Sequence, residues 1–493
     1  MTVRRILCIT GVLVFVFPAL TFADAKIVIT GLSVRFDYDN PQYESAATDS
    51  LTGNSSGTNE KDKESSAALG LRPVVKFLSE SKEGTFELLT APGIKHDFVD
   101  SELDWEVDVF LSAAQSLSKN WRLTTTNTLL RRDEYDPHNS VAVDSGAQDI
   151  ESESSIPALA VDRGRSRYWL NTFNFASEHP YREDSQLRLG FNNRILRNDE
   201  SVVRSYEDYN RTEIAMKQRH RFSSAWQAGV DFGVVRGEFD TTEMATSEEG
   251  NTTATEPTQE DALSEDVREY RARTLVGNNT FRHHDVSLGY SYIGARYDEA
   301  LHDDGDIHEI QLLWRHEYSR HVQTKLGAGP SHEKTEGQDV NWSGNGIAEW
   351  KYLLRSGSFS LTLEKGYDVD NFSGTGERGF VDFWNLRSGL EYRLLEDLSF
   401  NGHLAYRYED RKNPSAGDDS QAVAAGVEID AREEDFNKNR YTTGAGLRYS
   451  FLKDYSTSLN YTFIKQDSER IGEDYEDHRL VLGLSWEKEW LRW

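Results

Sequence analysis

The chain has one cysteine, Cys8, among its 493 residues. Because Cys8 lies close to the N-terminus, the rest of the chain has no disulfide, no thiolate metal site and no covalently held c-type haem, which needs Cys-x-x-Cys-His. After residue 23 no apolar run approaches the ~18 residues of a spanning helix. Basic residues are outnumbered 55 to 83 by acidic ones, and the net charge of -28 argues against nucleic acid as a partner.

The N-terminus has the layout of a secretory signal peptide. Arg4 and Arg5 precede the apolar stretch ILCITGVLVFVFPAL, which is followed by small residues such as Thr21 and Ala23. We predict a signal peptide over residues 1–23, with cleavage after Ala23 and, as the alternative, after Ala25. Residues 24–493 then form a single domain.

The remaining sequence is dominated by a period of two. In WNLRSGLEYRLLEDLSFNGHLAYRY, from Trp384 to Tyr408, apolar or aromatic residues alternate with polar or charged ones on both sides of a turn at Glu396-Asp397. A period of two indicates strands, and the turn makes a hairpin. Strands of about 9 to 11 residues with Tyr and Trp near their ends are typical of membrane-spanning strands.

This pattern recurs along the chain and predicts an all-β fold, a single transmembrane antiparallel β-barrel of about 18 to 22 strands, with 20 the best count. Weak alternation between residues 67 and 98, including a short strand over 85–90, leaves 18 open. A turn is expected around His179-Pro180. Both termini and the short turns should lie in the periplasm, and long acidic loops such as 240–266 should lie outside the cell.

The end of the chain resembles the signal by which outer-membrane barrels are handed to their assembly machinery. Leu480, Leu482, Leu484 and Trp486 have one parity and the terminal Trp493 has the other. A bulge or a short tail must therefore intervene if Trp493 also faces lipid.

Taken together, these features resemble the putative beta-barrel porin type 2 family, often associated with exopolysaccharide export, and more distantly the alginate-export porins. The resemblance rests on pattern over nearly the whole mature chain and carries no catalytic motif. It implies a passive outer-membrane channel in a Gram-negative cell, without a cofactor. The implied partners are outer-membrane lipids and lipopolysaccharide, the barrel-assembly machinery, and a polysaccharide with its periplasmic export components.

Inward parity defines the candidate functional residues. A ladder of arginines would guide an acidic polymer or another anion, because guanidinium forks bind carboxylate and phosphate. Equally, arginines and glutamates on neighbouring strands would neutralise each other and brace the wall. Inward aromatic residues, which would stack on sugars, are few on the clear strands. The lumen-lining candidates are Arg271, Arg273, Arg315, Arg387, Arg393, Arg407, Arg440, Arg448, Arg479, Glu269, Glu309, Glu391 and Glu409.

Two other classes of function stay open beside the channel. An outer-membrane lipase or protease needs Ser, His and a polar orienter at one rim, yet the chain has no Gly-x-Ser-x-Gly elbow, and His403 is one inward residue among charged neighbours. We therefore predict no enzyme and no metal site. The sheath of a multi-protein electron conduit would need a haem-bearing partner.

Overall fold

The computed structural model describes residues 25–43, 65–99, 101, 103–132, 167–198, 208–240, 266–280, 283–298, 303–336, 340–372, 378–411, 436–469 and 474–492. These residues form twenty strands in one sheet. The strands are β1 (Ala25–Tyr43), β2 (Ser66–Glu80), β3 (Gly84–Asp97), β4 (Leu103–Ser118), β5 (Trp121–Arg132), β6 (Tyr168–Arg182), β7 (Ser185–Asn198), β8 (Asp208–Arg221), β9 (Trp226–Asp240), β10 (Val267–Asn278), β11 (His284–Tyr297), β12 (Gly305–Ser319), β13 (Val322–Thr335), β14 (Asn341–Leu354), β15 (Gly357–Val369), β16 (Phe380–Arg393), β17 (Leu398–Arg411), β18 (Phe436–Phe451), β19 (Tyr455–Ser468) and β20 (Tyr475–Arg492).

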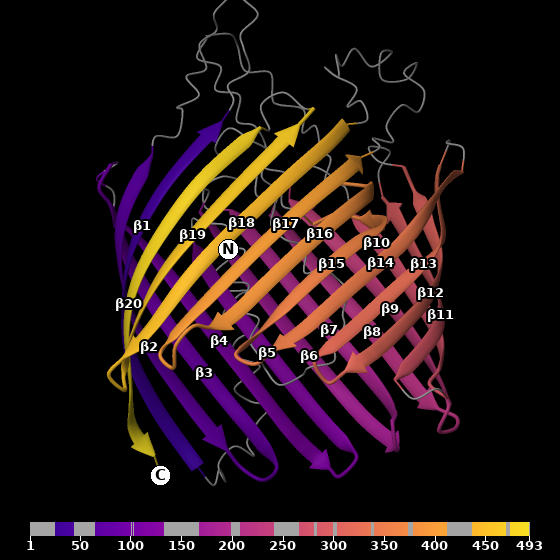
Figure 1. Cartoon of the computed structure of the whole chain (residues 1–493), viewed down its shortest axis with the longest axis horizontal. Helices are drawn as coiled ribbons and strands as arrows, with labels where there is room; N and C mark the ends of the chain where they lie inside the picture. Colours follow the sequence, from indigo (N-terminus) through magenta and orange to yellow (C-terminus); the bar gives the residue numbers. More distant parts are fainter. Residues whose placement is uncertain are drawn as a thin grey trace, which may run out of the picture.

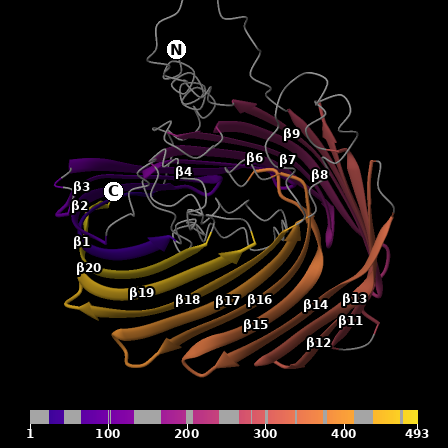
Figure 2. The same cartoon turned by 90° about the horizontal axis from the view of Figure 1, so that it is seen from above.

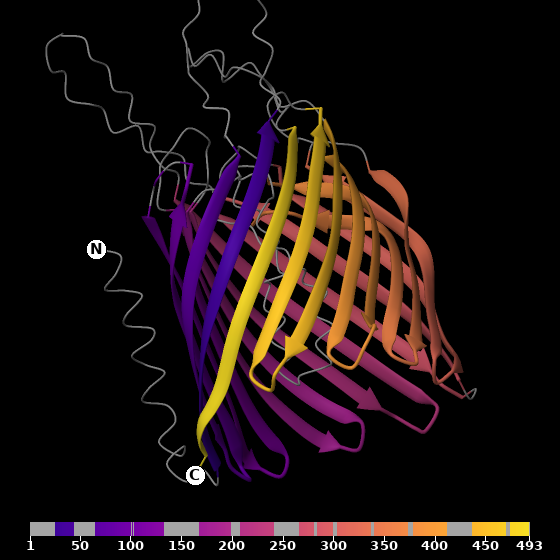
Figure 3. The same cartoon turned by 60° about the vertical axis from the view of Figure 1, so that its left-hand side comes forward.

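The sheet closes on itself. Each strand pairs antiparallel with the next one along the chain, and β1 also pairs with β20, from Ile27 opposite Arg492 to Tyr43 opposite Tyr475. Figures 1 and 3 show the resulting barrel with its inclined strands. Closure leaves no edge strand with unpaired backbone groups. The predicted antiparallel barrel and its count of 20 are confirmed.

The two ends of the barrel differ in their connections. Turns such as 119–120, 183–184 and 320–321 join strands at one end, where β20 also finishes. Connections such as 44–65 and 412–435 join strands at the other. We call these the short-turn end and the loop end. This division follows the predicted alternation of short turns and long loops.

Side chains on the outer face are apolar along the middle of the strands and aromatic toward both ends. Leu312 and Leu482 are exposed near the middle of β12 and β20. Aromatic side chains exposed nearer the short-turn end are Trp226, Tyr318, Tyr352, Tyr392 and Tyr455, and those nearer the loop end are Tyr38, Tyr270, Trp342, Trp384 and Tyr441. Two aromatic belts around an apolar band are typical of barrels that cross a bilayer.

Two predictions near prolines were wrong: the end of the strand over 85–90 and the turn around His179-Pro180. β3 continues past Thr90 through Pro92 to Asp97, and the β2–β3 ladder is interrupted only between the pairs Leu71–Ile94 and Val75–Thr90. Pro73 and Pro92 face each other in that gap, so neither has to donate an N–H to the other strand. β6 likewise runs through Pro180, which pairs with Gln186, and the turn follows a register shift before Arg182.

The last strand contains the irregularity that its parity requires. Glu489 pairs with Ile29 and Leu491 pairs with Val28, so Trp490 is an extra residue with no partner on β1. This bulge reverses the parity, and Leu491 takes the outward side with 56% of its surface exposed. Trp493 itself and the predicted signal peptide, 1–23, lie outside the described residues.

In the described part of the chain, no helix is long and apolar enough to cross a membrane.

Candidate functional site: the interior of the barrel

The register places all the candidate arginines and glutamates on one face of the sheet, the inner face. Around β16 to β19, for example, Glu391 pairs with Asn401, Asn401 with Gly446, and Gly446 with Asn460. On the opposite wall Arg271 pairs with Gly233 and Ile293. The predicted residues therefore share the interior, but the structure divides them into separate groups.

One strand connection folds into the interior at the loop end. We call residues 366–372 and 378–380 the infolded segment. Asn371 donates a hydrogen bond to Glu269 on β10 at 2.9 Å and accepts one from Tyr297 on β11 at 2.8 Å. Figure 2, seen from above, shows the β15–β16 end reaching across the opening toward the β6–β9 wall. The segment thus narrows the lumen.

An apolar cluster anchors this segment. The ring of Phe372 stacks on Phe239 at 5.5 Å between centroids and meets Tyr209 edge-on, also at 5.5 Å. The guanidinium of Arg378 lies over the ring of Phe239, 3.5 Å from its centroid. Inner-wall residues Tyr168, Leu196, Val235, Val267, Ala295 and Ile307 are buried in the same cluster. Such burial, with aromatic pairing, holds the segment against the wall.

Glycines permit this close approach at two positions. A Cβ at Gly237 on β9 would lie 2.7 Å from Cε1 of Phe372, so any larger residue would push the ring away. Gly379 has a φ of 121° and donates its N–H to Asn371 at 3.2 Å. Only glycine adopts that backbone conformation without strain.

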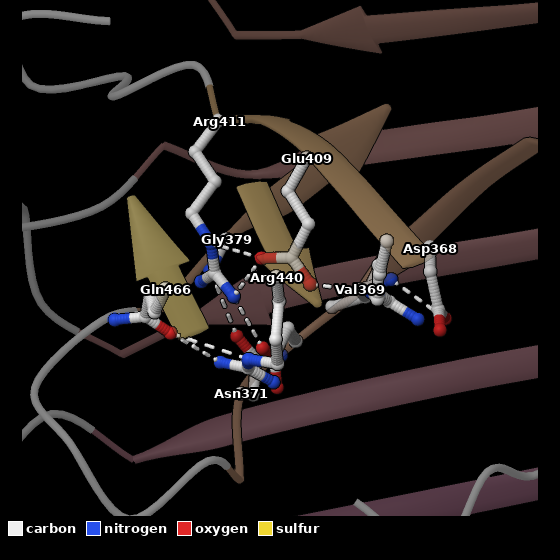
Figure 4. A network of polar contacts seen from close by, with 10 residues as sticks. Asp368, Val369, Asn371, Gly379, Glu409, Arg411, Arg440 and Gln466 are labelled. Carbon is white, nitrogen blue, oxygen red and sulfur yellow. Dashed lines mark hydrogen bonds and ion pairs between the residues drawn. The ribbon is translucent and has the colours of Figure 1, made fainter. Parts of the chain in front are cut away.

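Paired charges surround the infolded segment (Figure 4). The carboxylate of Glu409 accepts hydrogen bonds from Arg407 and Arg411, and Arg411 also binds Asp370 at 2.6 Å. On the facing wall Arg271 binds Glu269 at 2.8 Å. Asp368, on the segment, interacts electrostatically with both Arg271 and Arg407 and so links the two walls. The charges at this level are mutually neutralised.

Arg440 extends the same network by donating to Gln466 on β19 at 2.9 Å. Farther along the wall, Arg387 binds Glu364 at 3.2 Å across β15–β16, and Glu309 on β12 accepts a hydrogen bond from Ser291 at 3.2 Å. These contacts are the cross-strand bracing that the sequence offered as one of two roles.

Arg273, Arg315 and Arg479 lie on the inner face of β10, β12 and β20, away from the group around Glu409. Asp231 is opposite Arg273 on β9, Asp285 is opposite Arg315 on β11, and Asp39 is opposite Arg479 on β1. Acidic residues opposite all three arginines fit the bracing role as well.

A second group lies near the short-turn end. Arg393, Arg448 and Glu391 line a cavity of about 830 Å³ together with Arg355, from the β14–β15 turn. Serines and asparagines supply most of the remaining inward surface. Within the described part of the chain the side chains of these three arginines have no acidic partner and no hydrogen bond. This cavity, the short-turn basin, is the only place where several predicted arginines converge unpaired in the described structure.

Several residues of the interior were not found from the sequence. Asn371, Phe372 and Arg378 belong to a connection that the sequence presents as an ordinary loop, and Asp368 lies at the end of the predicted strand before it. Inner aromatic residues are also more numerous than predicted, because Tyr209, Phe239 and Tyr297 lie at strand ends where alternation is hard to follow. The usable signal was the sequence NFSGTGERGF, in which two phenylalanines and three glycines occupy a short connection.

The described residues offer little for catalysis or metal binding. His403 is opposite Gly389 and Gly444 on its two neighbouring strands, and neither glycine offers a nucleophile or a carboxylate. No group of three or more His, Cys, Asp or Glu side chains in the described part of the chain is arranged to hold a metal ion.

The inner and outer faces define a closed β-barrel with a charged interior. No family model matches the sequence, and no curated protein matches it. The chain is similar in structure to OpdQ of Pseudomonas aeruginosa, with a TM-score of 0.39 and 11% identity over 94% of this chain and 98% of that one. It is similar to the outer membrane protein OpdK of the same organism, at 0.38 and 14% over 95% and 99%. It is also similar to the siderophore receptor PirA of that organism, at 0.46 and 9% over 94% and 80%. At these values the likenesses carry no argument about function, and the fold class rests on the strand pairings.

Proposed function

We propose that the protein is a passive outer-membrane channel for polar solutes. The observation that carries this proposal is the separation of the two faces: an apolar band between aromatic belts outside, and charged and amide side chains inside. A barrel of twenty strands is too wide for side chains alone to fill its interior. The infolded segment reduces the opening at the loop end and would set the size of what passes.

The cargo we propose is a polysaccharide exported from the periplasm. Support comes from the resemblance to exopolysaccharide-associated porins and from the serine and asparagine side chains of the interior, which suit sugar hydroxyls. A channel of this kind has no energy source of its own, so a neighbouring assembly system would supply and push the polymer.

The first test is conductance. The purified barrel in a planar bilayer is expected to give stable ion currents, and salt gradients will report whether anions or cations are preferred. The absence of ion current under all conditions would contradict the proposal of a channel. Normal polysaccharide secretion in a deletion strain would contradict the proposed export role, and a general porin would then be the remaining proposal.

The second test addresses membrane placement. Leu386 lies outward near the middle of β16, where an arginine costs roughly 2 to 4 kcal/mol in a membrane barrel, whereas the cost falls to about 0 to 1 kcal/mol near the interface. We therefore expect Leu386→Arg to impair assembly more than Leu390→Arg, which is next to the belt residue Tyr392. The inward change Gly389→Ser is the matched control and should assemble normally, because only the flexible side chain of Ser360 is near. Equal assembly of all three, measured as heat-modifiable barrel in membranes, would contradict the assigned faces.

A rival enzymatic role has its own test. Lipid or peptide cleavage by the solubilised barrel, lost on His403→Ala, would replace the channel proposal. We expect no such activity, because glycines flank His403 on both neighbouring strands.

A further inference from the structure

The short-turn basin combines charged and hydroxyl-binding groups in one open cavity on the inner face. Arg393 at the end of β16 is opposite Ser399 on β17, and Ser399 is opposite Arg448 on β18. Arg355 joins them through the β14–β15 turn, because the N–H of Arg393 donates to the carbonyl of Ser356 at 2.7 Å. Neighbouring strands are about 4.8 Å apart, so the backbones at Arg393 and Arg448, on either side of β17, lie about 10 Å apart.

The charge balance of this basin differs from that of the whole chain. Three arginines face one carboxylate, Glu391, in a protein whose net charge is -28. Because no acidic side chain neutralises these arginines in the described part of the chain, their guanidinium forks remain available to a ligand. Guanidinium groups bind carboxylates through two parallel hydrogen bonds.

Amide and hydroxyl groups complete the basin. Gly446 has no side chain, and the amide oxygens of Asn401 and Asn460 lean over it from both neighbouring strands, where a Cβ would overlap them. Neither amide makes a hydrogen bond within the described residues. On β19 and β20 the hydroxyls of Ser456 and Ser485 lie 2.7 Å apart. These groups both donate and accept, as sugar hydroxyls require.

We infer that the short-turn basin is a binding site for a carboxylated sugar unit, with Arg355, Arg393 and Arg448 holding the carboxylate and Asn401 and Asn460 binding hydroxyls. Its volume of about 830 Å³ lies in the range of roughly 300 to 1,000 Å³ that is usual for small-ligand sites. The inference rests on the proposed function and names the class of its cargo: an acidic polysaccharide. In the orientation usual for such barrels the short-turn end faces the periplasm, so the basin would receive the polymer as it enters.

The test measures binding of trigalacturonate to the full-length barrel in detergent by calorimetry, with maltotriose as the neutral probe. The double variant Arg393→Gln with Arg448→Gln should bind trigalacturonate about tenfold or more weakly, since each lost charge-assisted bond contributes strongly. The matched control is Arg122→Gln with Arg219→Gln, two exposed inward arginines on the far wall. It removes the same charge and should keep the wild-type affinity.

A neutral change separates sugar recognition from simple charge. Asn401→Ala should weaken the binding of trigalacturonate and leave the binding of inorganic phosphate unaltered. Phosphate binding as tight as that of trigalacturonate would overturn sugar recognition. Equal losses in the basin double variant and the far-wall double variant would overturn the site. Calorimetry does not depend on conduction, so the two proposals can fail separately. Binding of trigalacturonate by a barrel that carries no current would support the basin as a site and contradict the channel. A conducting barrel that does not bind trigalacturonate would support the channel and contradict the site.

Discussion

The two ends of the interior use the same residue types in opposite ways. At the loop end Arg407 and Arg411 share the buried carboxylate of Glu409, and the infolded segment closes over them. At the short-turn end Arg393 and Arg448 are exposed, and the described structure gives them no acidic partner. Arginine is therefore a structural brace in one region and an available ligand-binding group in the other.

The difference follows from what covers each group. A buried charge must be paired because desolvation is costly, and the pairing removes that charge from any role in attracting cargo. An exposed arginine in a water-filled basin keeps its hydration and needs no partner. A uniform arginine ladder is thus a poor description of this barrel, since in the described structure the basin is the only place where several candidate arginines converge without acidic partners.

The largest effect is expected when the loop-end group is broken. Glu409→Gln leaves the buried guanidinium of Arg411 and the half-buried guanidinium of Arg407 without their shared carboxylate, and removing one member of a buried pair typically costs roughly 3 to 5 kcal/mol. The free energy of unfolding, measured by urea titration of the barrel in lipid vesicles, should fall accordingly. Arg393→Gln is the paired control at the other end and should change it by less than about 0.5 kcal/mol. Equal changes in the free energy of unfolding would contradict the distinction between paired arginines at the loop end and unpaired arginines at the short-turn end.

A second change tests whether the infolded segment really narrows the lumen. Phe372→Ala removes the ring that stacks on Phe239 and Tyr209, and loss of a buried phenylalanine typically costs about 3 kcal/mol or more. Because Phe372 itself lies in the connection between β15 and β16, outside the strand pairings, we expect the barrel to assemble while its single-channel conductance rises. An unaltered conductance would mean that the segment does not limit the flow.

The smallest effect concerns ion preference. Arg393→Gln together with Arg448→Gln removes unpaired charge and should shift the reversal potential in a salt gradient toward cations. Arg407→Gln with Glu409→Gln removes a neutral pair and should shift it little, provided that the barrel assembles. If the paired variant shifted selectivity as far as the unpaired one, the loop-end arginines would also act on passing ions.

A combined variant connects these measurements. Replacing Arg387, Arg393 and Arg407 with Gln removes two ion-paired arginines and one unpaired arginine. We expect its reversal potential to shift further toward cations than that of Arg393→Gln alone, because the carboxylates of Glu364 and Glu409 are left without their partner arginines.

The sequence by itself determined the strands, their number and the face that each residue occupies. Alternation is a local property of two or three residues, so Trp384 and Arg387 could be assigned to opposite faces without knowing any partner strand. A bulge near the C-terminus was one of two possibilities that parity indicated, the other being a short tail, and the structure has the bulge at Trp490. Prolines misled the prediction of strand boundaries, as at Pro92 and Pro180, because their backbone partners were unknown.

Tertiary structure alone decided which charges meet. Asn371 lies 102 positions from Glu269, and no local pattern relates them. Whether an arginine is neutralised depends on closure of the barrel and on where the infolded segment comes to rest, both of which bring together residues that are far apart in the chain. For this reason Arg407 and Arg393, equivalent in the sequence pattern, have opposite surroundings in the folded protein.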